Sequence, residues 1–271
     1  FAVMTIQRQK QNNSALWLVL GGAFVLRMIL AGVTEGYPYD MSCFVAWGDK
    51  LASEGPAAFY SADYFADYPP GYILVLGLVS LVRKALQLSY ESRWTYFLLA
   101  LIPAICDCAA VVLLDHISRR YMGQGRAQRC LVLFAAFCPL TLFDTGIWKQ
   151  IDGAFALPLL LCFWLLEERR YLLAAVLYGV ALAIKPQALL AGPVLAVCFL
   201  VAIADAVRDG KSPLKSVGQI FGGAALALLP PLLAAFYTVG IFTFAHCMHE
   251  RYLVLGMLLV LLAAARWNDI R

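Results

Sequence analysis

The chain has 271 residues, of which 62% are hydrophobic and only 14% are charged, and its mean hydropathy is +0.77. Soluble domains carry about 25% charged residues, so this composition excludes an ordinary soluble protein and predicts an integral membrane protein. The net charge of +4 does not indicate nucleic-acid binding, because the basic residues are scattered between apolar segments and form no stripe.

Apolar runs follow one another along the chain, with lengths near the roughly 20 residues that cross a bilayer as a helix. We expect membrane-embedded helices at residues 15–33, 94–116, 129–147, 154–166, 171–184, 188–207, 217–239 and 253–265. No repeat, low-complexity stretch or cleavable signal peptide interrupts this pattern. Residues 1–271 therefore read as a single all-α transmembrane domain.

The basic residues indicate which loops share a face, because Lys and Arg accumulate in short cytoplasmic loops. The candidate cytoplasmic set lies at residues 8–10, 119–129, 169–170, 208–215 and 266. These loops share one face only if the apolar run 71–88 does not cross the bilayer. Pro69 and Pro70 before this run, and Arg83 and Lys84 in its last turns, favour a helix at the outer interface.

With this orientation, the unusual polar clusters fall on the outer face, at residues 37–72, 144–153, 185–187 and 246–252. Charged groups at the ends of apolar segments are costly unless they are paired or face a polar cavity. The convergence of these separate segments predicts a functional site at the outer membrane surface.

Asp40 and Asp67 are the candidates for acid–base chemistry in the first outer cluster. A carboxylate within hydrogen-bond reach of a hydroxyl can act as a general base, but an Asp near a helix start also caps free N–H groups. Asp67 opens the motif DYPPGY, whose prolines fit the first turn of a helix. Both residues therefore have a capping and a catalytic interpretation, and either could be the base.

Four cations occupy the outer set: Lys149, Lys185, His249 and Arg251. A phosphate at headgroup depth would be a suitable partner for them. Any one of them could instead extend toward ordinary phospholipid. Their occurrence together favours a phosphate site.

Asp107 is an acidic residue inside an apolar run, where an unpaired charge is costly. Arg27 in the first apolar run is its candidate partner, and a proton pathway is the alternative. We expect the ion pair, because a proton relay through the membrane normally uses several ionisable residues and a single intramembrane acid does not suffice.

The sequence lacks a Walker loop, a dinucleotide fingerprint and any His/Cys set with zinc spacing. No soluble segment is large enough for a nucleotide-sugar domain, so we expect no cofactor and a donor substrate that arrives through the membrane. Among the eight cysteines, only Cys43 and Cys247 could meet outside the membrane, and sequence alone cannot pair them.

Five features occur in a fixed order: Asp40 after the first apolar run, then DYPPGY, WKQIDG, KPQALL and MHERYL. This set resembles the polyprenyl-phosphate-sugar-dependent glycosyltransferases of the GT-C superfold. It is similar in particular to the branch with the dolichyl-phosphate-glucose-dependent glucosyltransferases of the endoplasmic reticulum and their prokaryotic relatives. The resemblance runs through nearly the whole chain and implies a GT-C-like multi-span bundle with interfacial helices in the first outer loop.

The resemblance implies that Asp40 is the catalytic base and deprotonates an acceptor hydroxyl, which attacks the anomeric carbon of a hexose carried on polyprenyl phosphate. The configuration inverts and polyprenyl phosphate leaves. The implied acceptor is a hydroxyl of a lipid-linked glycan, a glycolipid or a protein. A metal is possible in the superfold, but the sequence places no second carboxylate firmly beside Asp40, so we expect metal-independent turnover. The implied phosphate ligands are Arg251, His249, Lys185 and Lys149. The implied substrate-binding residues are Asp67, Tyr68, Trp148, Gln150, Asp152, Gln187 and Glu250.

Members of this family are usually longer than 271 residues, so we expect segments to be missing after about residue 239. We expect the protein in a bacterial or archaeal plasma membrane rather than the endoplasmic reticulum, with its site on the non-cytoplasmic face. The alternative classes are a flippase or carrier of polyprenyl-linked glycans and a structural subunit of an envelope complex. No residue type distinguishes a glucose donor from a mannose donor.

Overall fold

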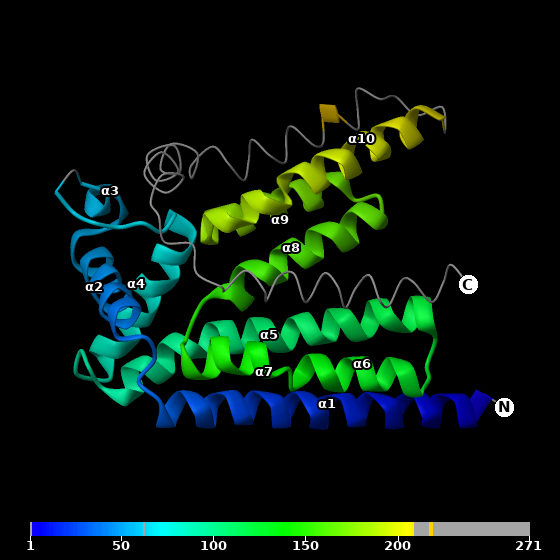
Figure 1. Cartoon of the computed structure of the whole chain (residues 1–271), viewed down its shortest axis with the longest axis horizontal. Helices are drawn as coiled ribbons and strands as arrows, with labels where there is room; N and C mark the ends of the chain where they lie inside the picture. Colours follow the sequence, from blue (N-terminus) through cyan, green and yellow to red (C-terminus); the bar gives the residue numbers. More distant parts are fainter. Residues whose placement is uncertain (1, 62, 209–216, 219–271) are drawn as a thin grey trace. The chain divides into compact units, whose positions relative to one another are not determined.

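The computed structural model describes residues 2–61, 63–208 and 217–218, which are largely helical and contain no β-strand (Figure 1). The described chain forms two compact units. The first contains residues 2–37 and 96–153, and the second contains residues 38–95 together with the described residues from 154 onward.

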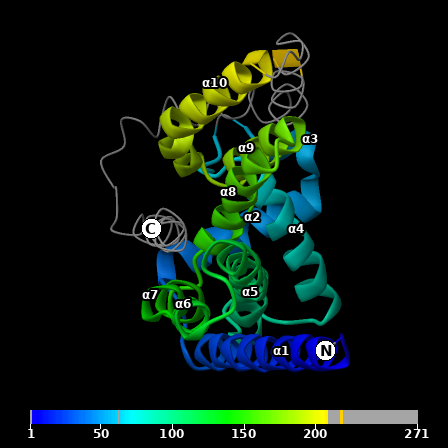
Figure 2. The ribbon, with the colours of Figure 1, turned by 90° about the vertical axis from the view of Figure 1, so that its right-hand side faces the viewer.

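The first unit is a bundle of long helices that share an apolar core. It contains α1 (Ala2–Val33), most of α5 (Arg93–Met122), α6 (Arg126–Ala136), α7 (Pro139–Thr141) and the π-helical segment η1 (Leu142–Ile147). In Figure 2, α5 and α6 are seen nearly end-on, whereas α1 runs obliquely across them. Small residues such as Ala23, Ala135 and Ala136 lie in the core beside Leu20 and Leu114 and let the helices approach closely.

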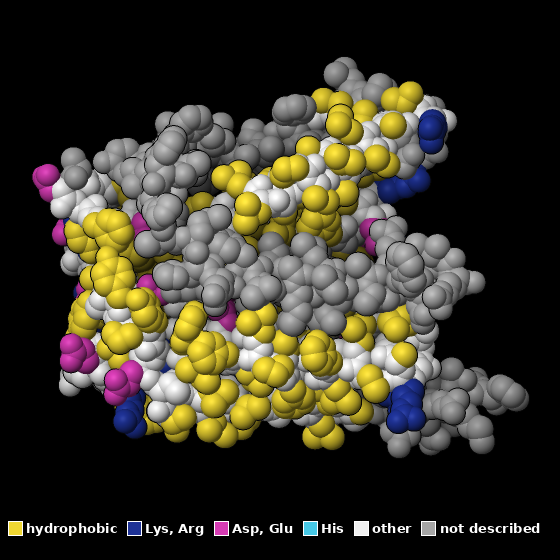
Figure 3. All heavy atoms as spheres, in the orientation of Figure 1, with side chains coloured by type: hydrophobic (Ala, Val, Ile, Leu, Met, Phe, Trp, Pro, Cys, Tyr) yellow, Lys and Arg dark blue, Asp and Glu magenta, His cyan; other side chains and the backbone are white. Residues whose placement is uncertain are grey.

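Three helical segments among the described residues are long and apolar enough to cross a bilayer: Ser14–Val33, Arg93–Met122 and Arg126–Ile147. They coincide with the first three runs expected from hydropathy and are consistent with an integral membrane protein. Large apolar side chains such as Leu18 and Phe134 are exposed on these helices. Figure 3 shows hydrophobic side chains over most of the drawn face of this unit. Such a surface suits lipid and not water.

A buried ion pair joins α1 to α5 inside the first unit, and hydrogen bonds connect it to α6, α7 and η1. Arg27 is only 1% exposed, and its Nε donates to Asp107 Oδ2 at 3.0 Å. The same guanidinium donates to Ala136 O at 2.8 Å and to Thr141 Oγ1 at 2.9 Å, and Thr145 Oγ1 donates to Asp107 Oδ2 at 2.7 Å. The expected pairing of Arg27 with Asp107 is therefore confirmed, and each charge is also hydrogen-bonded.

The second unit is built from shorter helices. It contains α2 (Pro38–Glu54), α3 (Pro56–Phe59), α4 (Pro70–Ala85), most of α8 (Asp152–Glu167), α9 (Tyr171–Ile184), the 3₁₀ helix η2 (Pro186–Ala191) and α10 (Gly192–Arg208). Helix α4 packs against both α2 and α9, and η2 contacts α9 and α10. The segments Tyr171–Ile184 and Pro186–Val201 are apolar but short. The expected run 253–265 and residues 219–239 lie outside the described part of the chain.

Helix α4 has 16 residues and is not among the segments long enough to span. One side of it buries Ile73 and Leu76, while Leu74, Leu78 and Leu81 are exposed on the other. This two-sided helix is compatible with the interfacial position expected from the sequence.

Candidate functional site

The segment between α1 and α5 is held together by close packing between α2 and α4. A Cβ on Gly48 would lie 2.5 Å from Leu76 O, and a Cβ on Gly77 would collide with the side chain of Leu51. At position 48 the atom met is backbone, so only glycine permits this approach, and alanine there would push the two helices apart and cost about 1–3 kcal/mol. At position 77 the atom met is the end of the Leu51 side chain, which can move aside.

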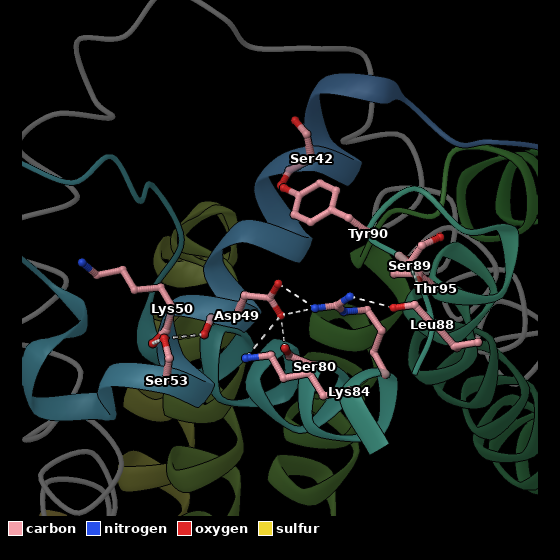
Figure 4. A network of polar contacts seen from close by, with 11 residues as sticks. Ser42, Asp49, Lys50, Ser53, Ser80, Lys84, Leu88, Ser89, Tyr90 and Thr95 are labelled. Carbon is pink, nitrogen blue, oxygen red and sulfur yellow. Dashed lines mark hydrogen bonds and ion pairs between the residues drawn. The ribbon is translucent and has the colours of Figure 1, made fainter. Parts of the chain in front are cut away.

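A charge cluster joins the same two helices on their polar side. Both oxygens of Asp49 accept hydrogen bonds from Arg83 Nη2, at 2.7 and 2.6 Å, and Ser80 Oγ donates to Oδ1. Figure 4 shows Ser80 and Lys84 pointing from α4 toward Asp49 on α2. Burial would raise the pKa of Asp49, but the hydrogen bonds from Ser80 and Arg83 and the charges of Arg83 and Lys84 outweigh it and hold this pKa below its ordinary value.

Aromatic side chains pack between α2 and the loop that leads to α4. Phe44 makes edge contacts with Tyr68 and Tyr72, at centroid distances of 5.6 and 5.4 Å. Trp47 Nε1–H donates to Phe65 O at 2.9 Å, and the Tyr60 hydroxyl donates to Tyr68 O at 2.8 Å. These contacts fix the course of the loop that carries Asp67. Tyr68 therefore has a packing role whether or not it also contacts a substrate.

The motif DYPPGY starts α4 and places it against the end of α9. Pro69 is the N-cap and Pro70 the first helical residue, as expected, and Pro70 loses no helical hydrogen bond there. A Cβ on Gly71 would lie 2.5 Å from Ala183 O, so this glycine permits the contact between the two helices. The contact brings Asp67, four residues before Gly71, near Lys185, two residues after Ala183.

Asp67 and Asp40 lie within electrostatic range of each other in the second unit. Burial and, to a lesser degree, the charge of Asp40 raise the pKa of Asp67 to about 6, although a hydrogen bond from its own backbone and the charge of Lys185 oppose this rise. The pKa of Cys43 on α2 is likewise raised, by burial of the thiol and by the negative charges of Asp67 and Asp40. Asp40 itself is half-buried in the first turn of α2. The structure thus supplies the second carboxylate beside Asp40 that the sequence had not located.

Lys185 supplies the cation of this cluster. It directly follows α9, is only 4% exposed, and its Nζ lies 5.6 Å from the centroid of the Phe155 ring. Gln187 lies on the adjoining η2. Gln187 Oε1 and Asp67 Oδ1 are buried and have no hydrogen-bond partner among the described residues. The second unit therefore offers two buried acceptor atoms and one buried ammonium.

The segment WKQIDG lies in the first unit, where Lys149 donates hydrogen bonds to residues outside the segment. Lys149 adopts a left-handed backbone conformation (φ 59°) just after η1, and its Nζ donates to Thr34 O and Thr34 Oγ1, both at 2.8 Å. A third, longer bond reaches Ile147 O at 3.5 Å. Burial lowers the pKa of Lys149 to about 8, against the opposing charge of Glu35. These bonds tie the end of η1 to the end of α1.

The neighbours of Lys149 differ in exposure. Gln150 and Asp152 are buried, with Asp152 the first residue of α8, whereas Trp148 is half-buried. Gln150 N–H donates to Asp144 O at 2.9 Å, which helps to terminate η1. Trp148 packs against Phe143 at a centroid distance of 4.9 Å. These contacts show how the segment is folded and leave its predicted sugar-binding role untested.

The predicted site residues thus fall into three groups. Asp40, Asp67, Tyr68, Lys185 and Gln187 belong to the second unit, and Trp148, Lys149, Gln150 and Asp152 belong to the first. His249, Glu250 and Arg251 lie outside the described residues, as does Cys247. In the described part of the chain, no group of three or more His, Cys, Asp or Glu side chains is arranged to hold a metal ion.

Sequence reasoning missed the Asp49–Arg83 pair. The two residues are 34 positions apart on two different helices, so no local pattern marks them. The pairing of Asp49 with Arg83 can be recognised only once α2 and α4 are known to pack side by side.

Comparisons of the chain with protein-family models, curated proteins and solved structures found no match.

Proposed function

We propose that this protein is a membrane glycosyltransferase that moves a hexose from a polyprenyl phosphate to an acceptor hydroxyl. The observation that carries the proposal is the cluster of Asp40, Asp67 and Lys185, from three separate segments of one unit of a chain with three candidate membrane spans. A carboxylate beside a second carboxylate and a buried ammonium provides the groups needed for proton transfer next to an anion.

In this proposal Asp40 is the general base. It removes the proton of the acceptor hydroxyl as the oxygen attacks the anomeric carbon of the donor. The bond from that carbon to the phosphate oxygen breaks, polyprenyl phosphate leaves with the electron pair, and the anomeric configuration inverts. Asp40 is partly exposed at the start of α2, where an acceptor can approach it.

Lys185 binds the donor phosphate in this proposal. The leaving group gains negative charge in the transition state, and a preplaced cation in a poorly solvated position stabilises that charge more than water would. Lys149 remains a predicted phosphate ligand, and in the structure its ammonium donates to the oxygens of Thr34. The roles predicted for His249 and Arg251 remain predictions.

The buried oxygens of Asp67 and Gln187 are the groups we assign to hydroxyl recognition. Buried polar atoms are normally hydrogen-bonded, and an acceptor without a partner costs about 1–3 kcal/mol. A sugar hydroxyl would satisfy such an atom. The donor is a lipid in this account because the sequence carries no nucleotide-binding motif and the protein is consistent with a membrane location.

We expect Lys185→Gln to weaken binding of a polyprenyl-phosphate hexose by about tenfold to a hundredfold, the loss of one charged hydrogen bond. Lys84→Gln is the matched control, since it removes the same charge from an exposed position of the same unit. Binding is measured by titrating the purified full chain in detergent with a fluorescent short-chain donor. Equal affinities for the two variants would remove Lys185 from the proposed donor site.

A further inference from the structure

Asp67 lies between a like charge and an opposite charge in the second unit. Asp40 repels its carboxylate and Lys185 attracts it, while burial disfavours the charged form. One of its oxygens, Oδ1, is buried and lacks a hydrogen-bond partner among the described residues. The ionisation of Asp67 is therefore balanced by its neighbours, and a new charge beside Lys185 would change that balance.

An anion bound at Lys185 would favour the protonated form of Asp67 in two ways. It would add a second negative charge near the carboxylate and would neutralise the ammonium that now favours ionisation. Both effects favour protonation of Asp67. The neutral acid gains an O–H that can donate to a phosphate oxygen, which a carboxylate cannot do.

We propose that the site binds a phosphate group and a proton together: Asp67 takes up a proton from solvent when an anionic phosphate diester binds at Lys185. This inference rests on the proposed donor class and adds a role for Asp67. Protonation of Asp67 also removes the repulsion between its charge and Asp40, the proposed base. The two carboxylates thereby take different roles.

The groups that face Asp67 come from two further elements. Helix α2 contributes Asp40, Cys43 and Tyr39, and the residue after α9 is Lys185. The pKa of the Cys43 thiol and the pKa of the Tyr39 phenol are both raised. Because the pKa of free Asp67 is raised only to about 6, its carboxylate is mostly ionised near pH 7. Binding should therefore take up nearly one proton per phosphate.

The test is isothermal titration of the purified full chain in detergent with farnesyl-phosphate hexose. This diester has no group of its own that titrates near neutral pH. Titrations near pH 7 in two buffers of different ionisation enthalpy give the number of protons taken up. For the wild type we expect close to one proton, and a Kd that rises about tenfold per pH unit above about pH 6.

Matched variants assign the proton to a residue. Asp67→Asn should bind the diester without proton uptake and with an affinity independent of pH, whereas Asp63→Asn, an exposed change in the same loop, should behave as the wild type. Asp40→Asn should keep the uptake. Uptake that disappears in Asp40→Asn but persists in Asp67→Asn would overturn the inference.

The wild-type titration alone separates two kinds of failure. Binding with no proton uptake and no pH dependence overturns the role of Asp67 and leaves the proposed donor class intact. Absence of binding overturns both.

Discussion

Replacing Asp40 with Asn should lower kcat for hexose transfer by about 10²–10⁴-fold, the range over which a positioned general base accelerates proton transfer. The amide keeps the size of the side chain but cannot accept the proton of the acceptor hydroxyl. Donor affinity should change little, because Lys185 remains. The measurement is initial rate against acceptor concentration, with labelled donor in excess.

The control for this prediction is Asp63→Asn, which changes an exposed acid of the same unit and should keep the wild-type rate. The rival assignment exchanges the two carboxylates. If Asp67→Asn is inactive while Asp40→Asn turns over normally, Asp67 is the base and Asp40 serves only the first turn of α2.

Arg27→Met should lower the free energy of unfolding by about 3–5 kcal/mol. The substitution leaves Asp107 buried without its cation, and it also removes the hydrogen bonds to Ala136 O and Thr141 Oγ1. Reversible unfolding in mixed micelles, followed by circular dichroism, measures this loss.

The double variant Arg27→Met with Asp107→Leu is the control. Replacing both charges by apolar groups leaves neither one buried alone, so most of the lost stability should return. A single variant as stable as the wild type would show that the ion pair contributes nothing to the stability of the first unit.

The sequence was most informative where composition alone decides the structure. The first three spans follow from apolar runs of sufficient length, and the Arg27–Asp107 pair follows from the cost of an unpaired charge in lipid. The start of α4 follows from two prolines and their position. In each case the physical requirement is local or involves few possible partners.

The remaining features depend on contacts that a sequence does not display. A Lys after an apolar run looks the same whether it binds a phosphate or, as Lys149 does, backbone and side-chain oxygens of Thr34. Asp67 acquires its raised pKa from burial and from Asp40 on another helix. The division of the predicted site between two units also follows no sequence pattern.

The central claim is that the protein breaks the bond between a hexose and polyprenyl phosphate. It is tested most directly by incubating the purified wild-type chain in detergent with a polyprenyl-phosphate hexose labelled in the sugar, together with native acceptor lipids. We expect label to pass to an acceptor and free polyprenyl phosphate to form in equal amount, without any nucleotide sugar. A donor that binds tightly but stays intact would contradict the account and would favour a flippase or carrier.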